Sequence, residues 1–146
     1  MKNTLNTTFQ PNKSYNTCNW FLIDCKNQTL GRLSSFITTI LRGKKSIYYY
    51  PSVFANNYII LINVDLIRLS KCKKHFLVYN PGKPGRSLKV KDTKDCLTTF
   101  IIKKSIKGML SKNERKHLIN KVKIYSGHIH PHTAQNPKKL RLSKLK

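Results

Sequence analysis

The sequence contains very few carboxylates. Five Asp and Glu residues stand against 29 Lys and Arg residues in a chain of 146, which gives a formal net charge of +24 at pH 7. A charge of this size on one small domain opposes compaction unless a polyanion shares it. Hydrophobic residues make up 39% of the chain, which excludes a wholly disordered basic tail. The composition therefore indicates a folded domain that binds nucleic acid, an anionic membrane surface or an acidic protein.

Long apolar runs and paired cysteines are also lacking. The longest apolar run, Tyr58–Val64, is too short to span a bilayer. Residues 1–19 have no apolar core and no Arg, so we expect neither a secretory signal nor an organelle transit peptide. The cysteines form no CxxC pair, which favours free thiols over a disulfide framework. They are Cys18, Cys25, Cys72 and Cys96.

The apolar residues that are present predict a βαβ unit. Trp20–Asp24 is apolar on both faces, as expected of a central parallel strand. Residues 30–41 carry apolar side chains at helical spacing between a potential cap, Thr29, and Gly43. Tyr58–Val64 is a second strand, so the first strand, the helix and this strand favour a right-handed crossover in a parallel sheet.

The second half of the chain adds elements around this unit. We expect a strand at Lys73–Tyr79, a loop at Asn80–Arg86 and a helix at Thr93–Leu110. The inward residues of that helix are expected to be Leu97, Phe100, Ile101, Ser105 and Met109. A short helix and strand follow around residues 118–125. The prediction is an α/β domain at 20–135, an extension at 1–19 and a basic arm at 136–146 that lies outside the core.

Positive charge is concentrated on predicted helix ends, loops and the C-terminal arm. One cluster is Arg42–Lys45, and a second runs from Lys103 to Lys123 with a single acid. Such a distribution suits contacts to phosphate backbones, whereas an ordinary solvated face carries both signs. Tyr48–Tyr50 either stacks on an unpaired base or packs at the rim of the core. A membrane role is disfavoured because both helices have a sheet to cover.

An RNA-cleaving enzyme is the alternative reading. His128, His130 and His132 alternate along an extended segment that could hold a metal, although no Asp or Glu follows Glu114. Asp24 and Asp65 end predicted strands and could form a carboxylate pair, or each could cap or turn the chain. No phosphate-loop motif or GxSxG motif is present. The alternative function is a metal- or carboxylate-dependent nuclease acting on RNA.

Motifs in a fixed order make the chain resemble the bacterial and plastid large-subunit ribosomal protein L13 family. The matching segments include the sequences LGRL, KGML and HPHTAQNP, and they extend over most of the chain. They are Trp20–Cys25, Leu30–Ser35, Leu41–Lys45, Tyr49–Pro51, Ile59–Val64, Pro84–Arg86, Ser105–Asn113, Val122–Gly127 and His130–Pro137. The resemblance implies a three-layer α/β/α domain on a small parallel sheet, with no catalysis, metal or cofactor.

The resemblance also implies partners. These are large-subunit rRNA and neighbouring large-subunit proteins, with a role in subunit assembly and no membrane or small-molecule substrate. The extension before Trp20 favours a plastid ribosome, with a bacterial cytoplasm or a mitochondrion as alternatives. The expected RNA contacts are Arg32 on the first predicted helix, selected cations of both clusters and the arm, and two histidines. They are Arg32, Arg42, Lys44, Lys45, Lys103, Lys107, Lys112, Arg115, Lys116, His130, His132, Lys138, Lys139 and Arg141.

Overall fold

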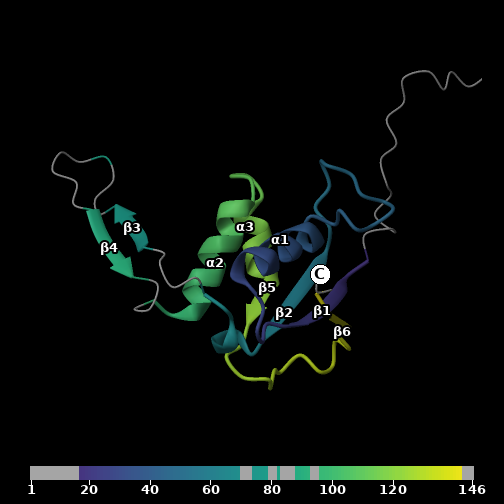
Figure 1. The fold of residues 1–146 in the computed structure, drawn as a ribbon. Helices are drawn as coiled ribbons and strands as arrows, with labels where there is room; N and C mark the ends of the chain where they lie inside the picture. The colour runs from purple at the N-terminus through teal and green to yellow at the C-terminus, as the bar shows by residue number, and fades with distance from the viewer. Residues whose placement is uncertain (1–16, 70–73, 79–81, 83–87, 93–95, 143–146) are drawn as a thin grey trace, which may run out of the picture.

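A four-stranded parallel sheet organises the protein (Figure 1). The computed structural model describes residues 17–69, 74–78, 82, 88–92 and 96–142. The sheet has the order β5-β2-β1-β6. Its strands are β1 (Asn19–Asp24), β2 (Asn57–Ile62), β5 (Val122–Ile124) and β6 (Lys138–Leu140). Residues 1–16 of the predicted extension and most of the predicted loop at 80–86 lie outside the described residues.

The predicted βαβ unit is confirmed. β1 pairs with β2 in parallel from Asn19 opposite Asn57 to Asp24 opposite Ile62, and α1 (Leu30–Leu41) connects them. Leu33, Ile37 and Leu41 of α1 are fully buried. Thr29 occupies the N-cap position, but its side chain makes no capping hydrogen bond. The helix is therefore held by its buried face more than by its cap.

Helix α2 (Thr98–Met109) packs against α1 through a face that includes only Ile101 and Ser105 of the predicted inward residues. Ile101, Ile102 and Ile106 are buried, and the Ser105 hydroxyl lies 2.8 Å from that of Ser34 on α1. The small serine pair permits close contact of the two helices. The inward positions predicted for Leu97, Phe100 and Met109 are wrong, because these residues are 78%, 46% and 42% exposed. Leu97 is the residue before the helix, and the isoleucines occupy the face toward α1.

The remaining elements are short. A 3-10 turn, η2 (Val64–Leu66), follows β2, while α3 (Arg115–Leu118) and η4 (Ile119–Lys121) precede β5. The expected strand near residues 73–79 is β3 (Lys74–Val78), which pairs antiparallel with β4 (Leu88–Asp92). Figure 1 draws this hairpin beyond α2, to one side of the parallel sheet.

Strand β6 corrects the prediction that the chain after residue 136 lies outside the core. Lys138, Lys139 and Leu140 pair in parallel with Phe21, Leu22 and Ile23 of β1. Leu140 packs against the hydrophobic core, whereas both lysines are exposed. Two consecutive lysines do not suggest a strand in the sequence. An edge strand nevertheless tolerates exposed cations that a central strand does not.

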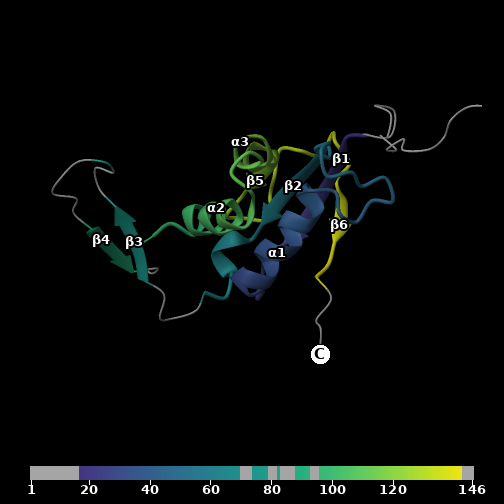
Figure 2. The same ribbon diagram turned by 90° about the horizontal axis from the view of Figure 1, so that it is seen from above.

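The two faces of the sheet are covered differently. Ile23, Ile59 and Leu61 face α1 and α2 in the main core. The segment 126–137 joins β5 to β6 along the opposite face (Figure 2). In this segment His132 contacts Trp20 and Tyr125. The prediction of an α/β fold on a small parallel sheet is confirmed. Among the described residues, no helix is long and apolar enough to cross a membrane.

The cysteines in the described part of the chain are free. Cys25 is fully buried at the end of β1, Cys18 is exposed, and Cys96 is half-buried. Burial, followed by the neighbouring charge of Asp24, raises the pKa of the Cys25 thiol to about 12. Cys25 is therefore a protonated core residue, and Cys72 lies outside the described residues.

Gly43 is the first position at which we predict the effect of a substitution. Its φ of +75° is left-handed, and a Cβ added there would lie 2.6 Å from the Cβ of Ala55. Gly43→Ala is therefore expected to lower the free energy of unfolding by about 2 kcal/mol or more, measured by urea denaturation. Gly31→Ala is the matched control, because it meets no atom within 4 Å and lies in a helix. Equal stability of the two variants would show that neither the left-handed φ nor the contact with Ala55 requires glycine at position 43.

Candidate nucleic-acid interface

The carboxylates whose side chains are described are used within the fold. Asp24 accepts hydrogen bonds of 3.0 Å from the Lys26 backbone N–H and from the Asn63 side-chain amide. Asp65 accepts a hydrogen bond from the Thr98 hydroxyl. These contacts support the structural alternative for both aspartates, which is to turn and tie the chain after a strand. Within the described ranges, Arg42–Glu114 is the one ion pair.

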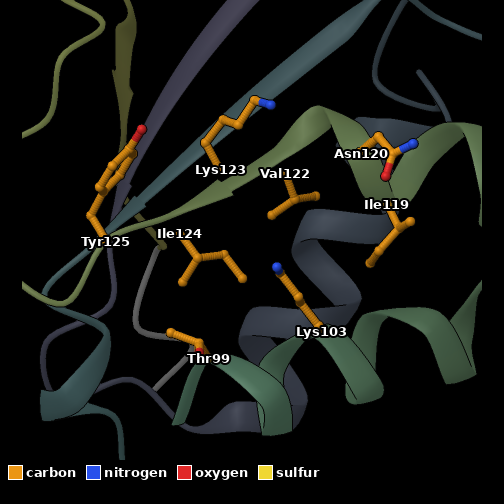
Figure 3. Close-up of a pocket in the computed structure, with 8 residues that line it drawn as sticks. All are labelled: Thr99, Lys103, Ile119, Asn120, Val122, Lys123, Ile124 and Tyr125. Atoms are coloured by element: carbon orange, nitrogen blue, oxygen red, sulfur yellow. The ribbon is translucent and has the colours of Figure 1, made fainter. Parts of the chain in front are cut away.

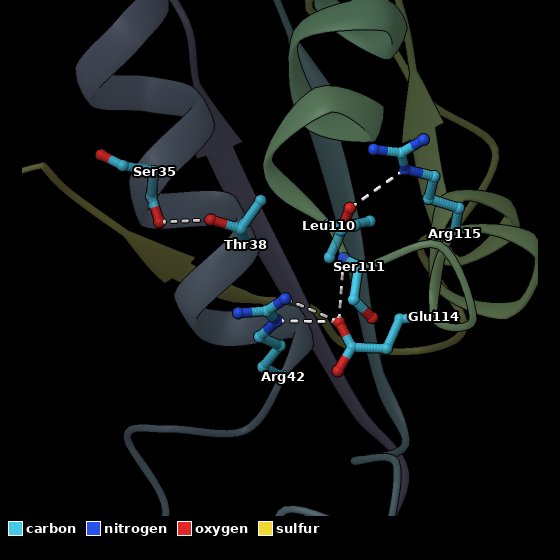
Figure 4. A network of polar contacts seen from close by, with 7 residues as sticks. All are labelled: Ser35, Thr38, Arg42, Leu110, Ser111, Glu114 and Arg115. Carbon is cyan, nitrogen blue, oxygen red and sulfur yellow. Dashed lines mark hydrogen bonds and ion pairs between the residues drawn. The ribbon is translucent and has the colours of Figure 1, made fainter.

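Glu114 joins the end of α1 to the start of α3 (Figure 4). Its Oε2 atom accepts from Nε and Nη2 of Arg42 at 2.9 and 2.8 Å, and from the Ser111 backbone N–H at 3.4 Å. Arg115 donates from Nε to the Leu110 carbonyl at 3.0 Å. Partial burial raises the pKa of Glu114, but the hydrogen bonds from Arg42 and Ser111 outweigh it and hold the pKa below its usual value.

The basic cluster at the end of α1 and around α3 is the strongest concentration of predicted contacts. We call it the α1–α3 cluster, and it consists of Arg42, Lys44, Lys45, Arg115 and Lys116. Lys44, Lys45 and Lys116 are exposed, whereas Arg42 is neutralised by Glu114. The Lys45 ammonium lies 4.0 Å from the centroid of the Phe36 ring, which holds the residue against α1. The lysines of the cluster are therefore exposed to a polyanion, and the Arg42–Glu114 ion pair holds together the elements that carry them.

A second basic region lies beside the edge strand β5. An open groove of about 610 Å³ runs between α2 and β5 and is shown in Figure 3. Lys103 points from α2 toward the strand, while Lys123 projects away from Lys103. Thr99, Asn120 and Tyr125 supply further polar groups to the lining. Lys107 is exposed one helical turn beyond Lys103, as predicted.

Other predicted contacts are spread over the molecule. Arg32 is exposed in the first turn of α1, about 15 Å along the helix from Arg42. Lys112 is exposed between α2 and α3. Lys138, Lys139 and Arg141 are exposed on β6 and immediately after it. The structure therefore gathers the α1–α3 cluster but does not bring all the predicted residues into one patch.

The two predicted histidines take part in a column of rings on the outer face of the sheet. Trp20 of β1 stacks on Tyr58 of β2 with centroids 4.5 Å apart, and His132 lies 5.2 Å from Trp20. His132 Nε2 is 2.9 Å from the Tyr125 hydroxyl. The His130 ring lies 6.5 Å from that of His132, and its Nδ1 atom is buried without a hydrogen-bond partner. These contacts give both histidines a role in the local fold, and RNA contact by them stays a prediction.

Lys121 and Lys123 were not among the predicted contacts. Lys121 donates to the Ala55 carbonyl at 3.0 Å and lies 5.7 Å from the Tyr58 ring centroid. Burial lowers the pKa of Lys121, as expected of an ammonium that serves the fold. Lys123 is exposed between buried Val122 and half-buried Ile124. This alternation in a strand was the signal available in the sequence for Lys123.

The described residues contain no group of three His, Cys, Asp or Glu side chains that could hold a metal ion. His130 and His132 are paired with rings, and Asp24 and Asp65 have separate hydrogen-bond partners. A parallel α/β domain with few described carboxylates, and with cations exposed on its helices and edge strands, is the class of basic domain whose surface suits a polyanion.

Comparison with known proteins identifies the family. The family model described as "Ribosomal protein L13" matches residues 18–131. The large ribosomal subunit protein uL13c of Trieres chinensis is 39% identical, over 93% of this chain and 97% of the relative. That of Pyropia yezoensis is 44% identical, over 91% and 96%, and the uL13 protein of Prochlorococcus marinus (strain MIT 9303) is 39% identical, over 85% and 86%.

The chain belongs to the ribosomal protein L13 family. The resemblance expected from the sequence motifs is thereby confirmed, and so is the prediction of a structural ribosomal protein and not an enzyme.

We predict that Glu114→Gln destabilises the protein in a pH-dependent way. The pKa of Glu114 is lowered in the folded state, so its stabilising effect is present above the unfolded pKa of about 4.3 and is lost as the pH falls through the folded value. At pH 7 the variant should lose about 1 kcal/mol of unfolding free energy, measured in urea. The difference from the parent should shrink as the pH falls below about 5.

Asn113→Lys is the matched control for the charge change, because it also raises the net charge by one unit and Asn113 is an exposed neighbour of Glu114. A loss of stability in Glu114→Gln that stays constant from neutral to acid pH would contradict the role assigned to the ion pair.

Proposed function

We propose that this protein binds large-subunit rRNA and supports the assembly of the large subunit in a plastid-type ribosome. The observation that carries the proposal is the strongly positive surface. Glu114 is paired with Arg42 and the exposed Asp24 and Asp65 hydrogen-bond to neighbouring groups, while many more lysines and arginines from α1, α2, α3 and β6 are exposed. A phosphate backbone is the polyanion that such scattered cations fit, because it presents charge along its whole length.

The family supports the choice of partner and location. The named relatives are proteins of the large ribosomal subunit, and two of them, from Trieres chinensis and Pyropia yezoensis, carry the plastid-type name uL13c. Bacterial relatives match at similar identity, which makes a bacterial cytoplasm the competing location. Neighbouring large-subunit proteins are the second class of partner that we propose.

The proposed phosphate contacts are divided between regions that the structure keeps apart. The α1–α3 cluster supplies one set, α2 supplies Lys103 and Lys107, and the last strand supplies a third. Phosphate contacts position a protein on RNA without reading its sequence. Contacts from several elements therefore fix the orientation of the protein better than one patch does. Arg32 and Lys112 complete the proposed set.

Sedimentation of a tagged copy from extracts of its own cells tests the function. We expect the protein to migrate with the large subunit at low salt and to remain there at about 0.5 M salt, where simple surface attraction is screened. Protein found free at the top of the gradient under both conditions would overturn the proposal.

We predict that the double substitution Lys44→Gln/Lys116→Gln weakens binding to transcribed large-subunit rRNA and makes it less salt-dependent. Each lost phosphate contact should reduce the slope of log K against log salt by roughly 0.7 to 0.9, measured by filter binding. Lys26→Gln is the control, because Lys26 is exposed beside Asp24 and is not a proposed contact. If Lys26→Gln reduced the slope as much as a lysine of the cluster does, the assignment of the contacts would be wrong.

A further inference from the structure

The loop after α1 exposes apolar and aromatic side chains in the middle of the α1–α3 cluster. We call residues 46–54 the aromatic loop. Ile47 is 96% exposed, Tyr48 is 48% exposed, and Tyr49, Val53 and Phe54 are each about 40% exposed. Surface aromatics that are grouped in this way mark an interaction site more often than scattered ones do.

The loop has a defined conformation. Gly43 turns the chain out of α1 with a left-handed φ, and the Ser46 N–H donates to its carbonyl at 2.9 Å. Further along the loop, the Tyr49 N–H donates to the Ser46 carbonyl and the Val53 N–H to the Tyr50 carbonyl, both at 3.3 Å. A site that is already ordered loses less entropy when it binds a ligand.

The end of the loop is tied to α3 by a ring contact. The Phe54 and His117 rings lie with centroids 5.8 Å apart and an angle of 26° between their planes. Lys116 precedes His117, and Lys44 precedes the loop at its other end, so exposed lysines flank the aromatics on both sides. Glu114, three residues before His117, is engaged with Arg42.

We propose that the aromatic loop is a binding site for unpaired nucleotides of the RNA, with bases stacked on Tyr48 and Tyr49 and phosphates bound by Lys44 and Lys116. This inference rests on the proposed function and names the kind of RNA that this site takes. Aromatic rings flanked by cations form the surface that binds single strands. A-form duplexes are recognised through phosphates and 2′-hydroxyls, because their bases are stacked within the helix and do not reach protein rings.

The charge distribution favours RNA over a protein partner for this loop. Tyrosine is common in both kinds of interface, but lysine is depleted from the centres of protein–protein interfaces. Here the exposed lysines adjoin the aromatic loop itself, and Glu114, the acid beside α3, is already paired with Arg42. The combination of stacking surface and uncompensated charge is complementary to unpaired nucleotides.

The full chain is tested against two probes, a single-stranded RNA of about twelve nucleotides and an RNA duplex of the same length. The double variant Tyr48→Ala/Tyr49→Ala should lose about tenfold in affinity for the single strand and little for the duplex. The matched control, Tyr48→Phe/Tyr49→Phe, keeps both rings and should bind like the parent. The salt slope should stay unchanged in both variants, because no cation is removed. Urea denaturation establishes that both are folded.

Four results would overturn the inference. An equal loss on the two probes, or no loss on either, shows that the rings do not stack on bases. Unchanged RNA affinity combined with loss of the alanine variant from the large subunit identifies the loop as a protein contact. Failure of the parent to bind either probe or large-subunit rRNA overturns the proposed function as well, which separates the two failures.

Discussion

The parallel pairing of β1 with β2 is the interaction against which the other elements are placed. Six register pairs align the two strands, and their Ile23, Ile59 and Leu61 side chains form the floor on which α1 and α2 pack. β5 and β6 extend the pair on either side. Burial of this apolar surface is the main favourable term for folding, and it must exceed the repulsion that a net charge of +24 produces. The cations accordingly are exposed on helices, on loops and on the edge strands that flank the pair.

The opposite face of the sheet uses rings where the helical face uses aliphatic side chains. Trp20 and Tyr58 sit side by side on β1 and β2, and His132 brings the returning chain onto them. The segment from β5 to β6 is thus anchored by a flat aromatic surface and by the bond between His132 and Tyr125. The HPH motif has an evident use in this arrangement. It secures an extended segment that has no helix or sheet partner of its own along most of its length.

The parts of the fold that could be predicted from the sequence are those set by local periodicity. The runs that form β1, α1 and β2 were recognisable because buried parallel strands and an amphipathic helix have distinct patterns. Strand β6 was not, since Lys138 and Lys139 resemble an arm until β1 is seen beside them. Which face of α2 is buried depends on its contact with α1. The spacing of apolar residues in the sequence alone does not determine that face. Among the candidate contacts, exposure of the lysines followed from charge, whereas the engagement of Arg42 by Glu114 required the folded chain.

The position of β6 links the order of synthesis to the order of folding. β1 is the first strand of the described chain to be synthesised. β6, the last described strand, pairs with the edge of β1 that β2 leaves open. Until that strand leaves the translating ribosome, β1 has β2 on one side and an open row of backbone donors and acceptors on the other. The sheet is therefore closed by one of the most distant contacts in the described sequence, which slows folding and delays completion until β6 has been synthesised. A nascent chain of this protein must pass through a stage in which its central strand is still an edge.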